Sequence, residues 1–197
     1  MSNTHWNGPV PAGLKTAEFV LRPIVASDAE KDHAAVMESR EYLRLWEQSS
    51  WPEDDFTVDA NRDDLVGLEQ RHADRRAFTY TVLDPDDDQC VGCVYLFPTG
   101  AAFLAKSTVT PVGEDEWGRV DIAVYFWVRR SRMDNGMDAR LLAALRGWLD
   151  ETWKADRVVF VTNEQFTQQV DLIRGTELIQ EFELAEPGKP GKYLAFG

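Results

Sequence analysis

The chain has 197 residues, of which 44% are hydrophobic, and this is enough to build one substantial core. Its 34 acidic and 21 basic residues give a formal net charge of −13, which repels phosphate backbones and attracts cationic partners such as amines. An acidic surface that only maintains solubility explains the charge equally well. No apolar run approaches the roughly 18 residues that span a bilayer. We therefore expect no nucleic-acid or membrane partner, and a cytoplasmic protein with a flexible N-terminal extension (residues 1–16) and a single domain (residues 17–197).

The first third of the chain predicts a strand followed by helices. Residues 19–24 have the composition of a strand, and Ser27 with Glu30 three positions later forms a capping-box pattern that opens a helix. Apolar residues carry a loosely helical pattern to Trp46, and Pro52 follows its end. Thr57 is then the expected cap of a second helix.

Strands dominate the middle of the sequence. Residues 77–83 and 91–97 flank a turn and predict a hairpin. Residues 98–118 hold no period and are expected to form a loop, although their apolar part could hide a short strand or cover a pocket. Residues 119–128 alternate regularly and predict a strand that is buried on both sides.

The last third alternates helices and strands. Leucines and tryptophans mark one face of a helix over residues 141–153. A strand is expected at 157–162, a short helix at 165–173, and a closing hairpin from 177–184 with 192–196. This order predicts an α+β fold with a mixed, mostly antiparallel sheet of about six to seven strands flanked by helices.

The cysteines and histidines do not predict a metal site. Cys90 and Cys93 have C-V-G-C spacing, but residues three apart in a strand face opposite sides of the sheet. His5, His33 and His72 are scattered along the chain. We expect two buried thiols and solvated histidines.

One segment carries a family resemblance. The strand that ends in Trp127-Val128 leads into Met133-Asp134-Asn135-Gly136-Met137-Asp138 and then a helix with Leu141-Leu142. This run resembles the fourth strand, phosphate loop and following helix of the GNAT N-acetyltransferase superfamily, whose loop reads Arg/Gln-x-x-Gly-x-Gly/Ala. The pattern positions hold Met133, Gly136 and Asp138 here. The first strand, first helix and third strand agree too, so the resemblance covers nearly the whole chain.

The resemblance implies a three-layer acyl-CoA N-acyltransferase fold and acetyl-CoA as co-substrate. Trp46 and Trp51 in the first helical region are most similar to the branch that acetylates the N-terminal amine of ribosomal proteins. The implied acceptor is a primary amine of a small molecule or of a polypeptide N-terminus, and a homodimer is plausible.

The resemblance also implies the site residues. Those expected to contact the cofactor are Phe126, Trp127, Val128, Arg132, Met133, Asp134, Asn135, Gly136, Met137, Asp138, Asn163 and Thr167. Core packing is an alternative for Trp127, and a strand end and a helix cap are alternatives for Asn163 and Thr167. Asp121 is the candidate general base, because it shares a strand face with Ala123, the usual position of that carboxylate.

The loop departs from the family pattern in its charges. Met133 lacks the expected cation, and Asp134 and Asp138 place carboxylates where a pyrophosphate would lie. Arg129, Arg130 and Arg132 could either bind phosphate or pair with these aspartates. Two hypotheses follow: an acetyl-CoA-dependent N-acetyltransferase, and a GNAT-fold binding or regulatory module that does not bind CoA.

Overall fold

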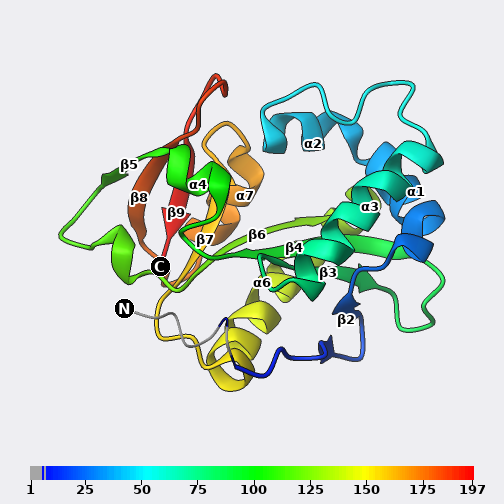
Figure 1. Cartoon of the computed structure of the whole chain (residues 1–197), viewed down its shortest axis with the longest axis horizontal. Helices are drawn as coiled ribbons and strands as arrows, with labels where there is room; N and C mark the ends of the chain where they lie inside the picture. Colours follow the sequence, from blue (N-terminus) through cyan, green and yellow to red (C-terminus); the bar gives the residue numbers. More distant parts are fainter. Residues whose placement is uncertain (1–5, 7) are drawn as a thin grey trace.

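The computed structural model describes residue 6 and residues 8–197, which form one open sheet with helices on both faces (Figure 1). Nine strands of this part of the chain are arranged in the order β1-β2-β3-β4-β6-β7-β9-β8-β5. The strands are β1 (Leu14–Lys15), β2 (Val20–Pro23), β3 (Phe78–Leu83), β4 (Cys90–Phe97), β5 (Thr108–Pro111), β6 (Ile122–Val128), β7 (Val158–Asn163), β8 (Gln180–Ala185) and β9 (Tyr193–Phe196). The predicted mixed sheet is confirmed, with more strands than expected.

The helices form the outer layers. They are α1 (Ala29–Glu38), α2 (Arg40–Glu47), α3 (Val58–Ala73), α4 (Ala102–Lys106), α5 (Arg130–Met133), α6 (Met137–Trp148) and α7 (Thr167–Arg174), with short turns η2 (Ala26–Asp28), η3 (Trp117–Arg119) and η4 (Leu149–Trp153). In Figure 1, α1, α2 and α3 lie on one side of the sheet and α6 lies on the other. Within the described residues, none of these helices is long and apolar enough to cross a bilayer.

The first helical region is interrupted where the sequence predicts a continuous helix. Ser39 leaves helical geometry (φ −101°, ψ 3°) and separates α1 from α2. At the start, Asp28 takes the role expected of Glu30, because its carboxylate reaches back to the N–H group of the cap residue Val25 (3.2 Å); it also binds Arg22 (2.7 and 2.8 Å). After the bend at Ser39, α2 lies against β7, where the Asn163 amide donates to the Leu45 carbonyl oxygen.

The segment expected to be a loop contains regular structure. Residues 98–118 include α4 and β5, and β5 pairs with β8 in antiparallel register from Thr108 opposite Ala185 to Pro111 opposite Phe182. Leu104 of α4 is buried. The pairing partner lies about 75 positions away in sequence, so no local period could reveal this strand.

The N-terminal residues pack on the domain. Trp6 is buried and stacks on Phe78 with ring centroids 4.8 Å apart, and the Tyr80 hydroxyl donates to the Pro11 carbonyl oxygen (2.7 Å). β1 pairs with β2. Residue 6 and residues 8–16 of the predicted extension therefore contact the rest of the domain, while residues 1–5 and 7 lie outside the described part.

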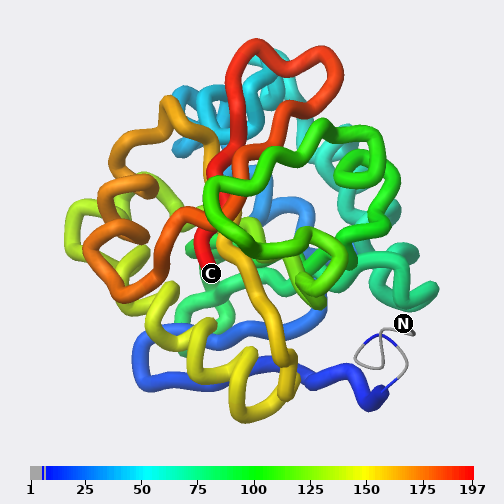
Figure 2. Tube along the Cα trace, turned by 90° about the vertical axis from the view of Figure 1, so that its left-hand side faces the viewer, coloured from blue at the N-terminus to red at the C-terminus, as the bar shows by residue number. Residues whose placement is uncertain are grey.

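The parallel pair β6 and β7 separates in the middle of the sheet. Their register runs only from Ile122 opposite Val158 to Val124 opposite Phe160. β6 continues to Val128, and β7 continues to Asn163 as a partner of β9. Residues 125–128 of β6 therefore have no backbone partner on the β7 side. Figure 2 shows the C-terminal hairpin extending beyond this point, near α2.

Candidate functional site

Two side chains satisfy the backbone of β6 where β7 leaves it. The Arg129 N–H group donates to Val91 on β4 (2.8 Å), so odd-numbered residues at this end of β6 direct their backbone toward β4. Phe126 and Val128 direct theirs toward the gap. The Phe126 carbonyl oxygen accepts from Gln169 Nε2 (3.0 Å), and the Val128 carbonyl oxygen accepts from the Tyr42 hydroxyl.

This edge-filling pair, Tyr42 and Gln169, is held by further contacts. Gln169 Oε1 accepts from the Thr162 hydroxyl (2.5 Å), and the Tyr42 ring stacks on Phe166 with centroids 5.3 Å apart. Burial raises the pKa of Tyr42, so its hydroxyl remains a donor. The Asn163 amide donates to the Leu45 carbonyl oxygen and ties β7 to α2. The groove along β6 is filled by side chains and not by backbone.

A carboxylate from α1 binds the backbone just before the loop from Met133 to Asp138. Glu38 accepts from the Ser131 N–H group (2.9 Å) and from Arg129 (2.6 Å), while the Ser39 hydroxyl oxygen accepts from the Arg130 N–H group (3.0 Å). Burial acts to raise the pKa of Glu38, but the hydrogen bonds from Arg129 and Ser131 outweigh it and lower that pKa to about 2. Glu38 is therefore ionised at any physiological pH.

The predicted loop residues gather at the N-terminus of α6, where a second carboxylate lies. Gly136 has φ 74° and precedes α6, as the resemblance implies. Asp138 is only 9% exposed, and its carboxylate accepts from the Ala139 N–H group (2.9 Å) and from Gln168 (3.3 Å). A carboxylate at a helix N-terminus interacts favourably with the helix dipole, as a phosphate would.

The other loop residues have contacts within the chain. Met133 and Met137 are buried. Exposed Asp134 pairs with Arg130 (3.1 Å), and the carbonyl oxygen of Asn135 accepts from Arg140 (2.9 Å). Arg132 is half-buried and shows no ion pair within 4 Å to the described residues. Of the arginines near the loop, Arg132 thus remains available for an anion.

The remaining predicted residues are dispersed. Asp121 lies just before β6, at the end opposite the loop, where its carboxylate accepts from the N–H groups of Asp156 and Arg157 (both 3.0 Å); its role as general base stays a prediction. The Trp127 backbone faces β4 by alternation, and its indole donates to Tyr95 (3.3 Å). Exposed Thr167 begins α7 without acting as its cap.

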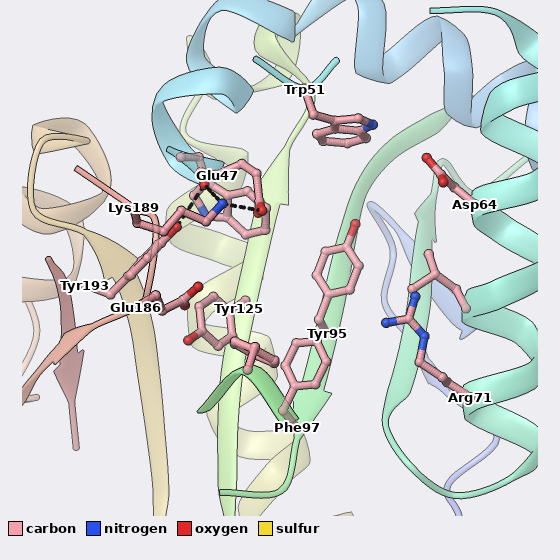
Figure 3. A pocket seen from close by; sticks show the side chains of 13 residues that line it. Glu47, Trp51, Asp64, Arg71, Tyr95, Phe97, Tyr125, Glu186, Lys189 and Tyr193 are labelled. Carbon is pink, nitrogen blue, oxygen red and sulfur yellow. Dashed lines mark hydrogen bonds and ion pairs between the residues drawn. The ribbon is translucent and has the colours of Figure 1, made fainter. Parts of the chain in front are cut away.

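A cavity of about 480 Å³ lies on the α2 and α3 side of β4 and β6 (Figure 3). Its lining is mostly aromatic: Trp46, Trp51, Tyr95, Phe97, Phe103, Tyr125 and Tyr193, with Leu68 and the charged residues Glu47, Asp64, Arg71, Glu186 and Lys189. Figure 3 shows Tyr95, Phe97 and Tyr125 between Asp64 and Arg71 of α3 on one side and Glu186, Lys189 and Tyr193 on the other. A volume of this size is typical of small-molecule sites.

The carboxylates of this cavity have altered acidity. Burial raises the pKa of Glu186, Lys189 partly offsets this effect, and Glu47 adds to it. Burial also raises the pKa of Asp64, against a hydrogen bond from Trp51. Perturbed carboxylates in a cavity with convergent polar groups indicate a binding or catalytic site.

The sequence prediction missed the residues that decide the character of both regions. The sequence predicted only helical positions for Tyr42 and Gln169, and Glu38 and Glu186 belong to no sequence motif. Two signals for the cavity were available: the alternation of β6, which puts Tyr125 and Trp127 on one face, and the apolar part of residues 98–118, which was expected as an alternative to cover a pocket and contributes Phe103 to the lining.

The cysteines are buried and free, as expected, but the reason given for this was wrong. The β3–β4 register shifts between Val82 and Leu83, so Thr81, which is opposite Cys93, also reaches the sulfur of Cys90 (3.7 Å). Both thiols therefore lie on the same face of the sheet. Among the described residues, no group of His, Cys, Asp or Glu side chains could hold a metal ion.

Comparisons with known proteins identify the fold. No protein-family model matches the sequence, and a search of curated proteins finds no match. Among solved structures, a ribosomal-protein alanine acetyltransferase from Vibrio fischeri is similar at TM-score 0.68 and 17% identity, with 94% of this chain and 95% of that chain covered. The RimL ribosomal-protein acetyltransferase in complex with coenzyme A has TM-score 0.66, 14% identity and 95% coverage of both chains.

A third similar structure, which is not a ribosomal-protein enzyme, has the same architecture. The microcin self-immunity acetyltransferase MccE, in complex with acetyl-CoA and AMP, has TM-score 0.68 and 12% identity, covering 95% of this chain and 96% of that chain. The chain thus has the fold of GNAT acetyltransferases, as the sequence resemblance implies.

Proposed function

We propose that this chain is an acetyl-CoA-dependent N-acetyltransferase that moves an acetyl group to a primary amine of a small molecule or of a polypeptide N-terminus. One observation carries the proposal: residues 125–128 of β6 have no backbone partner on the β7 side, and the Phe126 and Val128 carbonyl groups are satisfied there only by side chains. Such an edge accepts an extended amide-containing arm in the manner of an added strand. The aromatic cavity beside it can take the amine.

The residues at this edge have distinct roles in the proposal. Phe126 and Val128 offer backbone groups to an acyl-pantetheine arm, and the carboxamide of Gln169, which already donates to Phe126, is a chemical analogue of that arm's amides. Tyr42 and Gln169 turn aside when the arm binds. Gly136 and the N-terminus of α6 supply the backbone for a pyrophosphate, with Asp138 displaced from it.

The reaction transfers the acetyl group from sulfur to nitrogen. The neutral amine attacks the thioester carbonyl carbon, a C–N bond forms, and the C–S bond breaks as CoA leaves as a thiolate that takes up a proton. The attacking amine must lose its proton, and a carboxylate whose pKa is raised by burial is suited to hold an ammonium ion and to accept that proton. Glu186 has this character.

A thermal melt with acetyl-CoA tests the proposal. A ligand at about one hundred times its dissociation constant adds about 2.7 kcal/mol to the free energy of unfolding, which raises the melting temperature by several degrees for a chain of this size. We expect a shift that depends on acetyl-CoA concentration, whereas adenosine alone serves as the control. An unshifted melt at millimolar acetyl-CoA would falsify the proposal.

A second candidate is a binding or regulatory module that does not bind CoA. It is supported by Glu38 and Asp138, whose carboxylates already bind the N–H groups of Ser131 and Ala139 and would repel a pyrophosphate. This candidate predicts that the melt stays unshifted until both carboxylates are neutralised. The substitutions Glu38→Gln and Asp138→Asn therefore separate the two functions.

A further inference from the structure

Two buried polar groups in the cavity lack a hydrogen-bond partner. Tyr125 and Trp46 are each 6% exposed, and the Tyr125 hydroxyl and the Trp46 indole N–H group have no partner among the described residues. Both residues line the cavity. An unsatisfied buried polar group destabilises the folded state, so these two groups are suited to a ligand that supplies the missing bonds.

The charges around the cavity favour a cationic ligand. Lys189 is paired with Glu47 (2.8 Å), and Arg71 lies on the same helix as Asp64 and donates to the Gly67 carbonyl oxygen (3.1 Å). Of the three carboxylates that line the cavity, only that of Glu186 has no ion pair or hydrogen bond to the described residues, since Glu47 pairs with Lys189 and Asp64 has its hydrogen bond from Trp51. An ammonium ion would satisfy that carboxylate, and aromatic faces attract organic cations.

A bridge between the C-terminal hairpin and α2 closes one side of the cavity. The loop between β8 and β9 binds the end of α2 through Lys189 to Glu47 (2.8 Å) and through the Gly191 N–H group to Gln48 (2.6 Å). The Tyr193 hydroxyl adds a bond to the Glu47 carbonyl oxygen (2.9 Å). Figure 2 shows the hairpin, in red, beside the cyan helical region. An extended polypeptide cannot leave the cavity between these two elements.

We propose that the cavity binds a small primary amine with an apolar, ring-sized body, its ammonium group beside Glu186 and the Tyr125 hydroxyl, and that it does not take a polypeptide N-terminus. The aromatic lining contacts the body of the ligand, and the closed bridge limits its length. The inference rests on the proposed function for the acetylation of that amine, but binding itself requires no acetyl-CoA.

Titration of the cavity with 2-phenylethylamine in the absence of acetyl-CoA tests this inference. Quenching of tryptophan fluorescence or calorimetry reports binding, since Trp46 and Trp51 line the cavity. We expect 2-phenylethylamine to bind at least about tenfold more tightly than uncharged 2-phenylethanol and than trialanine. Equal affinity for the alcohol, or tighter binding of trialanine, would overturn the inference.

A pair of variants locates the binding site. Glu186→Gln should weaken 2-phenylethylamine by about tenfold or more and leave 2-phenylethanol unchanged, because it removes only the charge. Asp171→Asn, an exposed position on α7 outside the cavity, is the matched control and should change neither affinity. A circular-dichroism melt of each variant establishes that it is folded. Unchanged amine affinity in folded Glu186→Gln contradicts the inference.

The two proposals fail in different ways. If 2-phenylethylamine binds through Glu186 while acetyl-CoA leaves the melt unshifted, the cavity inference stands and the transferase proposal falls. If acetyl-CoA shifts the melt while 2-phenylethylamine does not bind, the transferase proposal stands and the small-amine inference is wrong.

Discussion

The two regions that meet at β6 differ in how their polar groups are satisfied. Along the edge toward β7, Tyr42, Gln169 and Glu38 supply a partner to each named backbone group. In the cavity on the adjoining face, the hydroxyl of Tyr125 and the indole of Trp46 have none among the described residues. Because unsatisfied buried groups are costly, a ligand that supplies partners for these two groups is favoured in the cavity, whereas the edge is complete without one.

This difference shows that one fold can contain a site whose polar groups are already satisfied by the chain and a second site whose polar groups are not. A backbone carbonyl satisfied by a side chain can exchange that partner for a ligand at little net cost, since one hydrogen bond replaces another. Ligand binding at the edge is therefore a competition with the chain itself. Binding in the cavity has no such competitor. Removal of a polar side chain should therefore strengthen ligand binding at the edge and weaken ligand binding in the cavity.

The largest expected effect comes from restoring the family pattern in the loop. The combined substitutions Met133→Arg, Asp134→Gly and Asp138→Gly remove two carboxylates and add a guanidinium at the N-terminus of α6. We expect about 100-fold tighter acetyl-CoA binding, because charge-assisted hydrogen bonds to phosphate replace repulsion. Calorimetry measures the affinity, and loss of the Asp138 carboxylate should cost about 1 kcal/mol of stability.

A matched variant separates this local effect from net charge. Asp86→Gly, Asp88→Gly and Val112→Arg make the same charge change at exposed positions far from the loop in sequence. Acetyl-CoA affinity should remain that of the original chain. An equal gain in the matched variant would assign the effect to the overall field of this acidic protein.

The next effect concerns α1, which ends in Glu38 and is followed by Ser39, the two residues that bind the backbone of Ser131 and Arg130. Asp32 of α1 is 4% exposed and accepts from Asn61 (2.9 Å), and burial raises its pKa from 3.8 to about 6. The folded protein therefore binds this proton more tightly than the unfolded chain. Its contribution to stability is present below about pH 4 and is lost as pH rises through 6, by about 3 kcal/mol in total.

Asp32→Asn should remove that pH dependence. Urea unfolding at about pH 4.5 and about pH 7 gives the slope, and the variant should be the more stable protein at neutral pH. An unchanged slope in the variant would show that Asp32 is ionised in the folded state across this range.

A smaller effect is expected from opening the edge of β6. Gln169→Ala removes the donor to Phe126, so an incoming amide no longer competes for that carbonyl oxygen. Acetyl-CoA should bind about tenfold more tightly while the melting temperature falls, since one net hydrogen bond contributes about 1 kcal/mol. Gln70→Ala, on the exposed side of α3, is the control and should change neither quantity. Weaker acetyl-CoA binding in Gln169→Ala would mean that Gln169 assists the cofactor.

The smallest effect is a pH response confined to the cavity. Burial raises the pKa of both Glu186 and Asp64, so their negative charge is lost at a higher pH than in a solvated carboxylate. The affinity for 2-phenylethylamine should fall several-fold between about pH 7 and about pH 4, and Glu186→Gln should flatten this profile. At the filled edge, the pKa of about 2 for Glu38 predicts no change over the same range.

Local patterns predicted much of the fold. The hairpin of β3 and β4, the buried strand β6 and the helix that ends near Gly175 were all expected, because alternation and turn residues act over a few positions. β5 was expected only as an alternative to a loop, because its pairing partner β8 is distant in sequence. The break at Ser39 was missed because a contact with Arg130 stabilises it, and this contact forms only in the folded chain.

The site was harder to predict than the fold. The loop from Met133 to Asp138 was placed correctly at the start of a helix, yet the sequence could not show that Glu38, from another helix, binds the Ser131 backbone just before this loop. Asp121 was a reasonable base by strand alternation, but alternation fixes only the face and not the end of the strand that a residue reaches. The cavity forms only where six separate helices and strands (α2, α3, α4, β4, β6 and β9) meet.

Direct detection of acetyl transfer tests the central claim. The purified chain is incubated with acetyl-CoA and 2-phenylethylamine, and mass spectrometry follows the amine while a thiol reagent follows released CoA. The account predicts that N-acetylated amine and free CoA appear in equal amounts and that Gln169→Ala still forms product. No product from either protein, at acetyl-CoA concentrations that saturate the melting shift, would contradict it.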